Sequence, residues 1–366
     1  MLDAGLVKKT AGEIGFDLVG ITAARPMWEL AELLEERQAR GLVPAFVSGN
    51  VAARLDPGLL LPGAKSVVMT AINYYNPLTE QAAALGLSRS TFGTDYHLVL
   101  GAMLEELGQR LQRMDPGLRY YQFVDTGPLL ERELARRAGL GWFGKNASLI
   151  TPEYGSWVFL GGLLVNRELE EDRPLQKDCA HCTACLKACP SGALEEPYLV
   201  NPHRCLSYLT QKKGFLTGAE REQLGGRVYG CDACQAACPV NQKTAQATKH
   251  RDFRPDWPED LSLAQLALMD NRTFRRLFGQ SALAWRGKTN LKRNAVLALG
   301  RRQDEDVIPV LAQALRDPAP VVRAHAAWAL SRMAQPGVKA LLTETLARER
   351  DPRVAAELQA ALRQVK

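Results

Sequence analysis

The chain has 366 residues, 46% of them hydrophobic, with a slightly negative mean hydropathy and a formal net charge of +6. This length predicts two or three domains, each with enough apolar residues for a core. The longest strongly apolar run, "WVFLGGLLV" at 157–165, is too short for a transmembrane helix. The first residues, "MLDAGLVKKT", lack the basic-then-apolar order of a signal peptide. We therefore expect a cytoplasmic protein with no membrane contact.

Helical and strand-like patterns alternate over residues 1–170. "LVKKTAGEIG" has helical spacing and ends on glycine, and "FDLVGIT" follows as a short strand. We predict a long helix at 96–114 and further strands at 65–75, 119–124 and 155–165, the last of them central in its sheet. This region is therefore expected to be one α/β domain with a core large enough for a cofactor.

The stretch "FVDTGPLLERELARRAGLGWFGKN" starts at Phe123 and holds the first candidate for catalysis. A predicted strand ends at Asp125, and Pro128 is predicted to open a helix that Gly139 ends. Asp125 is either a helix N-cap or a functional carboxylate, because cofactor pockets form where strands end beside helix starts. "GLGWFG" matches GxGxxG, but it follows a helix and leads toward a strand. It therefore predicts a turn rather than a dinucleotide site.

All eight cysteines fall between residues 179 and 238, which predicts metal binding in a reducing compartment. The first group spaces its thiols as C-x2-C-x2-C-x3-C-P from Cys179 to Pro190. This is the spacing of two-cluster bacterial ferredoxins, in which the fourth cysteine ligates the other cluster. Structural zinc more often uses two separated CxxC pairs, so 4Fe-4S clusters are the favoured interpretation.

The second cysteine group, from Cys231 to Pro239, lacks the first cysteine of the ferredoxin motif. Cys205 is the only cysteine left in the chain, so elimination assigns it to this second group. The predicted ligands are, for cluster one, Cys179, Cys182, Cys185 and Cys238, and for cluster two, Cys189, Cys205, Cys231 and Cys234. Two adjacent clusters conduct electrons, so we expect the N-terminal domain to hold an electron-accepting cofactor.

The rest of the chain divides into a small module and a helical end. Residues 171–250 read as a ferredoxin-like module, and residues 251–366 as a helical domain. In the latter, "DPAPVVRAHAAWALSRM" from Asp317 resembles "DPRVAAELQAAL" from Asp351 at the spacing of HEAT-like repeats. The expected fold is therefore α+β and multidomain, with an N-terminal α/β domain, a two-cluster module and C-terminal HEAT-like helices.

Positive charge gathers in one stretch of the helical domain, between Asn271 and Gln303, which contains no Asp or Glu. Its basic residues are Arg272, Arg275, Arg276, Arg286, Lys288, Lys292, Arg293, Arg301 and Arg302. A stretch of one sign favours a polyanion such as nucleic acid, although it can also be a solvated surface. Trp285 within it either stacks on an RNA base or belongs to the core.

These segments together resemble the epoxyqueuosine reductase family. The resemblance is carried by "VDTGPLLER…AGLGWFGKN", "TPEYGSWVFL", both cysteine groups, "RCLSYLTQKKGFL" (204–216) and "WRGK" (285–288), and it spans nearly the whole chain. It implies a cobalamin bound without its lower base in the N-terminal domain. It also implies a substrate tRNA that carries epoxyqueuosine at the wobble position. The product would be queuosine, with the epoxide oxygen lost as water.

The resemblance also implies roles for particular residues. Asp125 matches the family's proton donor. The expected cobalamin contacts are Arg54, Ser88, Asp125, Arg132, Asn146, Leu149, Ser207, Thr210, Gln211 and Lys212. The expected tRNA contacts are Arg286, Lys288, Lys292 and Arg293. Packing or surface solvation is the alternative at each cobalamin contact, whereas Gly214 and Gly230 are expected in turns. We also expect a monomer and an electron donor that the sequence does not identify.

Two other functions remain open from the sequence. One is a related cobalamin and iron–sulfur enzyme with a small substrate, such as a reductive dehalogenase; the basic helical end argues against it. The other is an electron carrier or RNA-binding scaffold without catalysis, which leaves the stretch at 123–146 without a purpose. His97 in "DYHLVLG" lies one residue off the spacing of a cobalt-ligating histidine motif, so it is not assigned as a ligand.

Overall fold

The computed structural model describes residues 2–302 and 304–365 and forms two compact units. The first unit comprises Met1–Pro77, Thr94–His203 and Asp232–Arg254. The second comprises Leu78–Gly93, Arg204–Cys231 and Pro255–Lys366. The chain therefore passes between the units several times, and each unit is described by itself. The division into three domains at residues 170 and 250 stays a prediction.

The first unit is built on a four-stranded antiparallel sheet with the strand order β1-β2-β6-β3. The strands are β1 Leu18–Ala23, β2 Ser66–Asn73, β6 Val158–Val165 and β3 Tyr120–Phe123. β2 is buried along its whole length, as a strand covered on both faces must be. The prediction of a central strand at 155–165 is confirmed, because β6 pairs with β2 on one side and β3 on the other.

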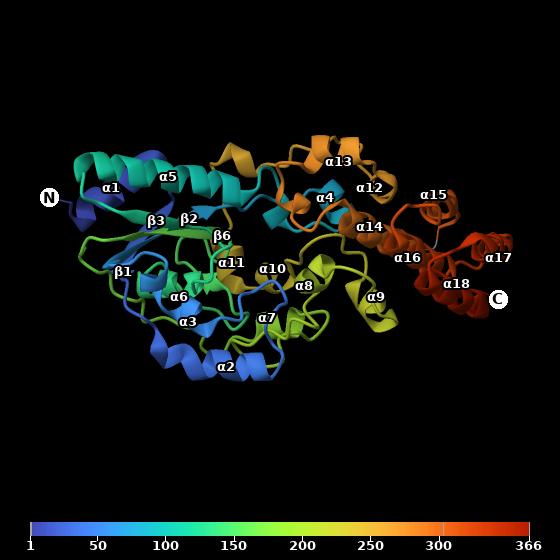
Figure 1. The fold of residues 1–366 in the computed structure, drawn as a ribbon, viewed down its shortest axis with the longest axis horizontal. Coiled ribbons are helices and arrows are strands. Elements are labelled where there is room, and N and C mark those ends of the chain that lie inside the picture. The colour runs from blue at the N-terminus through green and yellow to red at the C-terminus, as the bar shows by residue number, and fades with distance from the viewer. Residues whose placement is uncertain (1, 303, 366) are drawn as a thin grey trace. The chain divides into compact units, whose positions relative to one another are not determined.

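Helices cover both faces of this sheet (Figure 1). α1 (Ala4–Ile14) and α5 (Tyr96–Met114) pack on the face that presents Val68 and Ile72. α6 (Glu131–Arg137) packs on the opposite face, against Met69 and its neighbours. Alternate residues of β2 thus enter two separate cores, as the period of a strand requires. The same face also carries the helices α2 Ala31–Ala39 and α3 Val51–Leu55 (Figure 1).

The predicted boundaries hold for α5 and for the end of α1, which begins two residues earlier than predicted, but not for the start of α6. α1 ends at Gly15, whose φ of 116° is in the left-handed region where glycine is favoured. α5 has the predicted bounds and buries the stripe of leucines that predicted it. Pro128 does not open α6, which begins three residues later at Glu131 and ends before Gly139 (φ 73°). The residues between β3 and α6 therefore form a loop.

Most of the cysteine module also belongs to the first unit. Its short helices are α7 Ala184–Ala188, α10 Ala233–Ala236 and α11 Pro239–Thr244, and a hairpin of β4 Trp142–Phe143 and β5 Leu149–Ile150 precedes them in the chain. Asn241 on α11 ties the module to the segment before β6. Its Oδ1 accepts from the backbone N–H of Ser156 at 2.7 Å, and its Nδ2 donates to the Ser156 hydroxyl at 2.8 Å.

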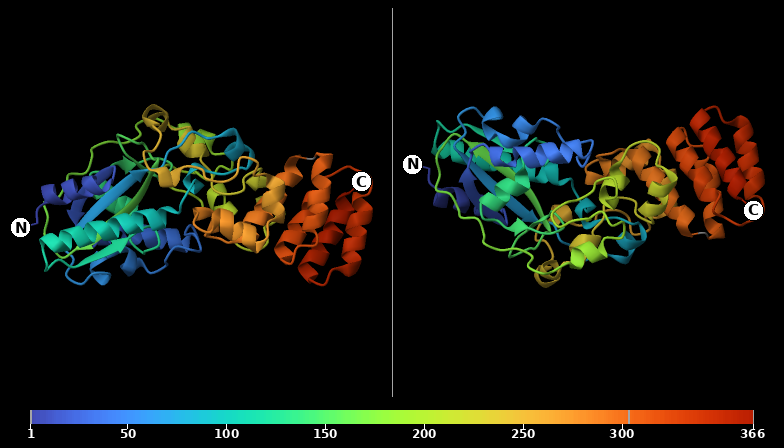
Figure 2. Two further views of the ribbon diagram at one scale, coloured as in Figure 1. Left: turned by 90° about the horizontal axis from the view of Figure 1, so that it is seen from above. Right: turned by 90° about the horizontal axis from the view of Figure 1, so that it is seen from below.

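The second unit is helical in its described part. Its helices are α4 Glu80–Ala84, α8 Leu206–Gln211, α9 Gly218–Leu224, α12 Leu263–Leu268, α13 Asn271–Phe278, α14 Lys288–Arg302, α15 Ile308–Ala314, α16 Pro320–Leu330, α17 Val338–Arg348 and α18 Pro352–Gln364. α14, α16 and α18 pack side by side as successive layers (Figure 2). α16 and α18 each begin with proline after an Asp-containing turn, so the predicted helical repeat is confirmed.

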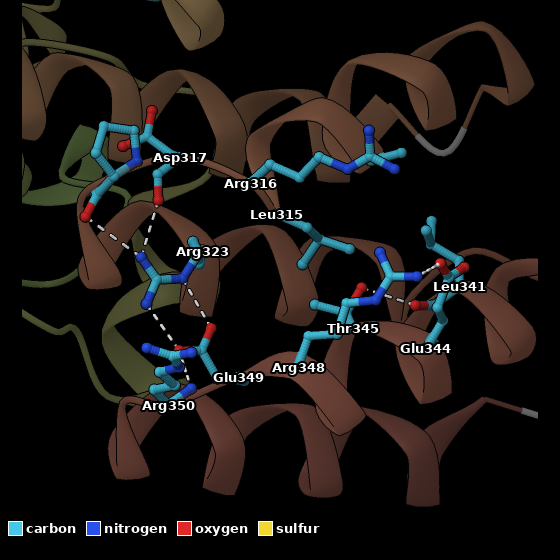
Figure 3. A pocket seen from close by; sticks show the side chains of 12 residues that line it. Leu315, Arg316, Asp317, Arg323, Leu341, Glu344, Thr345, Arg348, Glu349 and Arg350 are labelled. Carbon is cyan, nitrogen blue, oxygen red and sulfur yellow. Dashed lines mark hydrogen bonds and ion pairs between the residues drawn. The ribbon is translucent and has the colours of Figure 1, made fainter.

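An arginine braces the last two layers (Figure 3). Arg323 on α16 makes a two-pronged ion pair with Glu349, with N–O distances of 2.7 and 2.8 Å. The Arg323 guanidinium lowers the pKa of the Glu349 carboxyl. The same guanidinium donates to the carbonyl of Asp317 at 2.8 Å, so it joins the turns before both helices. No helix in the part of the chain that the structure describes is long and apolar enough to cross a membrane.

Candidate active site and iron–sulfur module

Three predicted ligands of cluster one lie in the first unit, where two of them influence the third electrostatically. Burial raises the pKa of the Cys185 thiol, and the nearby Cys179 and Cys238 raise it further. The helices that carry Cys185 and Cys234, α7 and α10, also pack together. All eight cysteines lie in the described residues and none forms a disulfide. A soft, disulfide-free donor set of this kind fits an iron–sulfur cluster.

Cys189, a predicted ligand of cluster two, already has the surroundings of a thiolate. Its Sγ accepts the backbone N–H of Ala193 at 3.2 Å and lies 3.7 Å from the Ser191 hydroxyl. Burial opposes ionisation of the thiol, but these hydrogen bonds outweigh it, and the pKa of Cys189 is lowered. Thiolate is the form that ligates metal. The remaining assignments to cluster two stay predictions.

Cys205 and Cys231 lie in the second unit, each beside residues predicted to bind the cofactor. Cys205 precedes α8, and Cys231 follows Gly230, whose φ is 73°. A Cβ at Gly230 would lie 2.0 Å from the Ser88 hydroxyl, so only glycine fits this turn. The backbone N–H of Gly230 donates to the Thr210 hydroxyl at 3.0 Å.

The predicted cobalamin contacts on the segment at 204–216 mostly form hydrogen bonds or ion pairs with other residues of the protein. The Thr210 hydroxyl donates to the Ser207 carbonyl at 2.8 Å, and Thr210 is fully buried. Lys212 pairs with Glu220 at 2.5 Å. The Gln211 carbonyl accepts from Arg286 at 2.8 Å. These contacts shape the segment, and contact with cobalamin stays a prediction for Ser88, Ser207, Thr210, Gln211 and Lys212.

The structure corrects two of the four predicted tRNA contacts. Arg293 is fully buried on α14 and donates to the carbonyls of Lys212 at 2.6 Å and Gly214 at 2.8 Å. Burial lowers the pKa of Arg293 to about 10. Lys292 is also buried, and its ammonium pairs with the carboxylate of Asp317. Neither cation reaches a phosphate in this arrangement, because both serve as internal braces.

The other end of the basic stretch faces solvent. Trp285 is 51% exposed, so the alternative that it belongs to the core is wrong. The guanidinium of Arg286 lies 5.4 Å from the centre of the Trp285 ring. Lys288 is partly exposed at the start of α14. The exposed arginines of α13 belong to the same unit; they are Arg272, Arg275 and Arg276.

Asp125 lies on the loop after β3 and is not a helix cap. Its φ of 49° is in the left-handed region, which costs energy for a residue with a Cβ. Its side chain is 67% exposed, and Oδ2 accepts a hydrogen bond from the Tyr96 hydroxyl at 2.6 Å. Its backbone N–H donates to Glu131 Oε1 at 2.5 Å. The N-cap alternative is therefore wrong, and the carboxylate is held open to solvent.

Tyr96 was not identified as a functional candidate from the sequence, and His97 was considered there only as a cobalt ligand and left unassigned. His97 Nε2 lies 3.9 Å from Asp125 Oδ2, while its Nδ1 lies 2.7 Å from Asp95 Oδ1. The Tyr96 ring stacks on His97 with ring centres 4.1 Å apart, and on Phe159 at 4.2 Å. Burial and the negative charge of Asp125 raise the pKa of Tyr96, so its hydroxyl stays a proton donor. An adjacent Tyr-His pair opening a helix was the available signal.

Glu131 supplies a second carboxyl group at this site. Burial raises its pKa to about 8, and the charge of Asp125 contributes to the shift. A cavity of about 220 Å³ lies between α5 and the segment that runs from β3 into this loop. His97, Gly101 and residues 121–124, 126 and 127 line it. The site thus combines a solvent-facing acid, two further proton-bearing groups and a space beside them.

Three predicted cofactor contacts of the first unit gather at the hairpin of β4 and β5. Asn146 is buried, yet its Nδ2 has no hydrogen-bond partner among the described residues. Arg132 donates to the carbonyl of Ala147, and Leu149 is 3% exposed. Buried donors normally have a hydrogen-bond partner. The unpaired amide nitrogen of Asn146 therefore suits a ligand that carries hydrogen-bond acceptors. The amide groups at the edge of a corrin ring provide such acceptors.

A sheet domain with an exposed acid beside a cavity, joined to a two-cluster cysteine module, defines an iron–sulfur reductase. Residues 178–241 match the family model for a 4Fe-4S double cluster binding domain. Residues 54–126 match the model "Epoxyqueuosine reductase QueG, DUF1730", and residues 281–363 match HEAT repeats.

Curated and solved relatives name the family. The chain is 38% identical to epoxyqueuosine reductase of Bacillus subtilis, over 97% of this chain and 94% of the relative. A crystal structure of epoxyqueuosine reductase with an epoxyqueuosine-modified tRNA-Tyr stem loop is 36% identical. It has a TM-score of 0.92 and covers 98% of this chain and 97% of that one. The chain belongs to the epoxyqueuosine reductase family, which decides against the dehalogenase and carrier alternatives.

Proposed function

We propose that this chain reduces epoxyqueuosine to queuosine at the wobble position of tRNA. The reaction breaks both carbon–oxygen bonds of the epoxide and forms the carbon–carbon double bond. It consumes two electrons and two protons and releases the oxygen as water. The observation that carries the proposal is the loop acid Asp125, held beside a cavity in the unit that contains six of the eight cysteines.

The electrons are proposed to travel through two 4Fe-4S clusters. Cluster one takes Cys179, Cys182, Cys185 and Cys238, and cluster two takes Cys189, Cys205, Cys231 and Cys234. The mutual charge effects among Cys179, Cys185 and Cys238 support the first set. The thiolate-favouring surroundings of Cys189 support its place in the second.

Cobalamin bound without its lower base would supply a strongly reducing cobalt centre for the epoxide. Arg132, Asn146 and Leu149 are its best-supported contacts, since they gather at one hairpin with an unsatisfied amide donor. Arg54 belongs to the same unit. The further proposed contacts are Ser88, Ser207, Thr210, Gln211 and Lys212.

Asp125 is proposed to protonate the departing epoxide oxygen. Tyr96 and Glu131 hold its carboxylate and its backbone N–H, respectively. His97 lies close enough to return a proton to Asp125 after a small movement of either side chain. A solved structure of epoxyqueuosine reductase from Bacillus subtilis has its catalytic aspartate loop swung out of the active site. The loop position of Asp125 would allow the same movement.

The proposed partner is tRNA bound at its anticodon loop. Trp285, Arg286 and Lys288 are the exposed or partly exposed groups that suit an unstacked base and phosphates. The proposed setting is the cytoplasm, with the chain acting as a monomer and receiving electrons from a separate donor.

Cofactor loading and turnover test this function together. The full chain is purified and reconstituted anaerobically, and absorption spectra measure clusters and bound cobalamin. We expect two clusters and one cobalamin per chain, and conversion of epoxyqueuosine in tRNA when a reductant is added. An Asp125→Asn variant serves as a matched control that should load both cofactors. Clusters without cobalamin uptake would instead favour a simple electron carrier.

A further inference from the structure

The loop from Cys179 to Cys182 brings predicted ligands of cluster one to the surface of the first unit. All eight cysteines lie in the described residues, and among them only Cys182 is exposed. Cys179 and Cys238 are half-buried, and Cys185 is buried. A cluster held by these four thiolates would therefore have one edge at the protein surface, beside Cys182.

The predicted ligand sets also separate the two clusters by their surroundings. Cluster one takes all four ligands from the first unit. Cluster two takes Cys205 and Cys231 from the second unit, where both lie beside predicted cofactor contacts. Electron tunnelling falls off steeply with distance, so an outside donor delivers electrons fastest at the cluster nearest the surface. Cluster one is therefore the point of entry in this arrangement.

Hydrogen bonds fix the loop that presents Cys182. The backbone N–H of Ala180 donates to Asp178 Oδ1 at 2.6 Å, and the Ala180 carbonyl accepts from the ammonium of Lys145 at 2.6 Å. The N–H of Cys182 donates to the carbonyl of Cys179 at 3.0 Å. Lys145 belongs to the hairpin of β4 and β5, so the hairpin and the cysteine loop form one surface. A surface that is already ordered loses little entropy when a partner docks.

Positive charge surrounds this loop. Lys177 is exposed, and its ammonium lies 5.6 Å from the ring centre of Trp142 on the same hairpin. Lys187 is exposed on α7, which begins two residues after Cys182. In the described part of the chain, no ion pair joins Lys177 or Lys187 to an acid. Residues 176–187 contain one acid, Asp178, whose carboxylate accepts the loop N–H.

The turn at 196–199 adds an aromatic side chain to the same surface. Tyr198 is 41% exposed, and its backbone N–H donates to the carbonyl of Lys145 at 2.9 Å. Glu196 in this turn lies 4.0 Å from Arg40, and the preceding Glu195 accepts from Asn201 at 3.1 Å. The nearest further acids thus have partners of their own, and the lysines keep a local excess of positive charge.

We propose that Lys145, Lys177, Cys182, Lys187 and Tyr198 form a docking surface for a small acidic electron-transfer protein. The proposal rests on the proposed function, which needs a separate electron donor. Opposite charges on two surfaces raise the association rate more than the affinity, which suits the brief, small contacts of electron-transfer partners. An exposed tyrosine is typical of the residues that such a contact covers.

The rate of cluster reduction tests the docking surface. The full chain with both clusters is mixed with reduced flavodoxin, a small acidic flavoprotein used as the probe, and both absorption spectra are followed by stopped flow. Each encounter passes one electron to an oxidised cluster, and the anionic flavin hydroquinone becomes the neutral semiquinone. The second-order rate constant should fall as ionic strength rises.

Charge reversal locates the contact on the protein. Lys177→Glu and Lys187→Glu should each lower the rate constant about 5- to 10-fold at low salt and change it little at high salt. Lys9→Glu is the matched control, because α1 covers the sheet face opposite α6 and the hairpin of β4 and β5. It should leave the rate constant unchanged. Dithionite, a small reductant, should reduce the clusters of every variant to the same extent.

The outcomes separate the docking surface from the proposed function. Fast, salt-dependent reduction without turnover of epoxyqueuosine would count against the proposed function and still support the docking surface. A rate constant that ignores salt and both substitutions, or that falls equally in Lys9→Glu, would overturn the docking surface. Lower tRNA affinity in Lys177→Glu and Lys187→Glu, with unchanged reduction by flavodoxin, would assign the surface to RNA and also overturn it.

Discussion

The loop of Asp125 and the start of α14 were both predicted to be functional, and both predictions named charged residues. In the structure, the charged side chain of the loop is exposed, whereas two of those on α14 are buried. Asp125 is 67% exposed and sits in a left-handed conformation that Tyr96 and Glu131 stabilise. Arg293 is fully buried and satisfies backbone carbonyls of the segment at 204–216. A charged residue in a functional segment can thus either contact a ligand directly or hold in place the residues that contact it.

The difference follows from packing rather than from charge. α14 is buried from Asn290 to Gly300, because neighbouring helices cover it on all sides. Lys292 and Arg293 must therefore find partners inside the unit, and they do so in Asp317 and in carbonyl groups. The Asp125 side chain is instead 67% exposed, and hydrogen bonds with Tyr96 and Glu131 help to hold its left-handed backbone conformation.

Removing the exposed carboxylate should have the largest effect on activity. Asp125→Ala is expected to lower kcat about 10²- to 10⁴-fold, because a positioned general acid contributes that much. The melting temperature should change little, since the side chain is mostly exposed. Single-turnover assays at matched cobalamin and cluster content measure this effect. Full turnover in Asp125→Ala would contradict the role of proton donor.

Removing the buried cation should act on stability instead. Arg293→Ala is expected to cost about 3 kcal/mol or more of unfolding free energy, because it leaves buried carbonyls without donors. Denaturant unfolding measures it, with Arg302→Ala on the exposed end of the same helix as the control. If Arg293→Ala instead kept its stability and lost tRNA affinity, the buried position would be wrong.

Substitutions at the exposed end of the basic stretch should weaken tRNA binding without unfolding the protein. Trp285→Ala should lower affinity by about 1–3 kcal/mol if a base stacks on the ring. Lys288→Ala should weaken binding less. It should also reduce the slope of log affinity against log salt concentration by about one unit. Titrations of tRNA at several salt concentrations measure both. An unchanged affinity in both variants would place the RNA surface elsewhere, for instance on α13.

The smallest expected effect is on the pH dependence of stability. It tests the contact between Glu131 and the backbone of the Asp125 loop. Because the folded pKa of Glu131 is about 8, the folded state gains a proton relative to the unfolded chain between its ordinary pKa of 4.5 and about 8. The contribution of Glu131 to stability is therefore complete below that range and lost as pH rises through it. Glu131→Gln should flatten this dependence. The measurement is the melting temperature of both proteins from pH 5 to 9. If the two pH dependences were parallel, Glu131 would not be a neutral carboxyl group with a raised pKa.

Helices, strands and the cysteine module could be predicted where short sequence patterns determine them. The leucine spacing of 96–114 and the glycine at the end of α1 predicted their helices, and the apolar run at 155–165 predicted the central strand. Cysteine spacing identified the two-cluster module, since ligand geometry is written into neighbouring residues. The helical repeats followed from similar Asp-Pro turns.

Features that depend on distant contacts escaped prediction. Tyr96 reaches Asp125 across 29 residues because α5 packs on the sheet next to β3, which no local pattern shows. The exposure of Trp285 and the burial of Arg293, eight residues later, are decided by which helices lie alongside.

Nucleoside analysis of tRNA tests the central claim most directly. The reconstituted protein, cobalamin and a reductant are incubated anaerobically with tRNA carrying epoxyqueuosine, and the digested nucleosides are weighed by mass spectrometry. We expect a product lighter by one oxygen atom, formed only when clusters, cobalamin and reductant are all present and lost in Asp125→Ala. Epoxyqueuosine that remains unchanged with a fully loaded wild-type protein would contradict it.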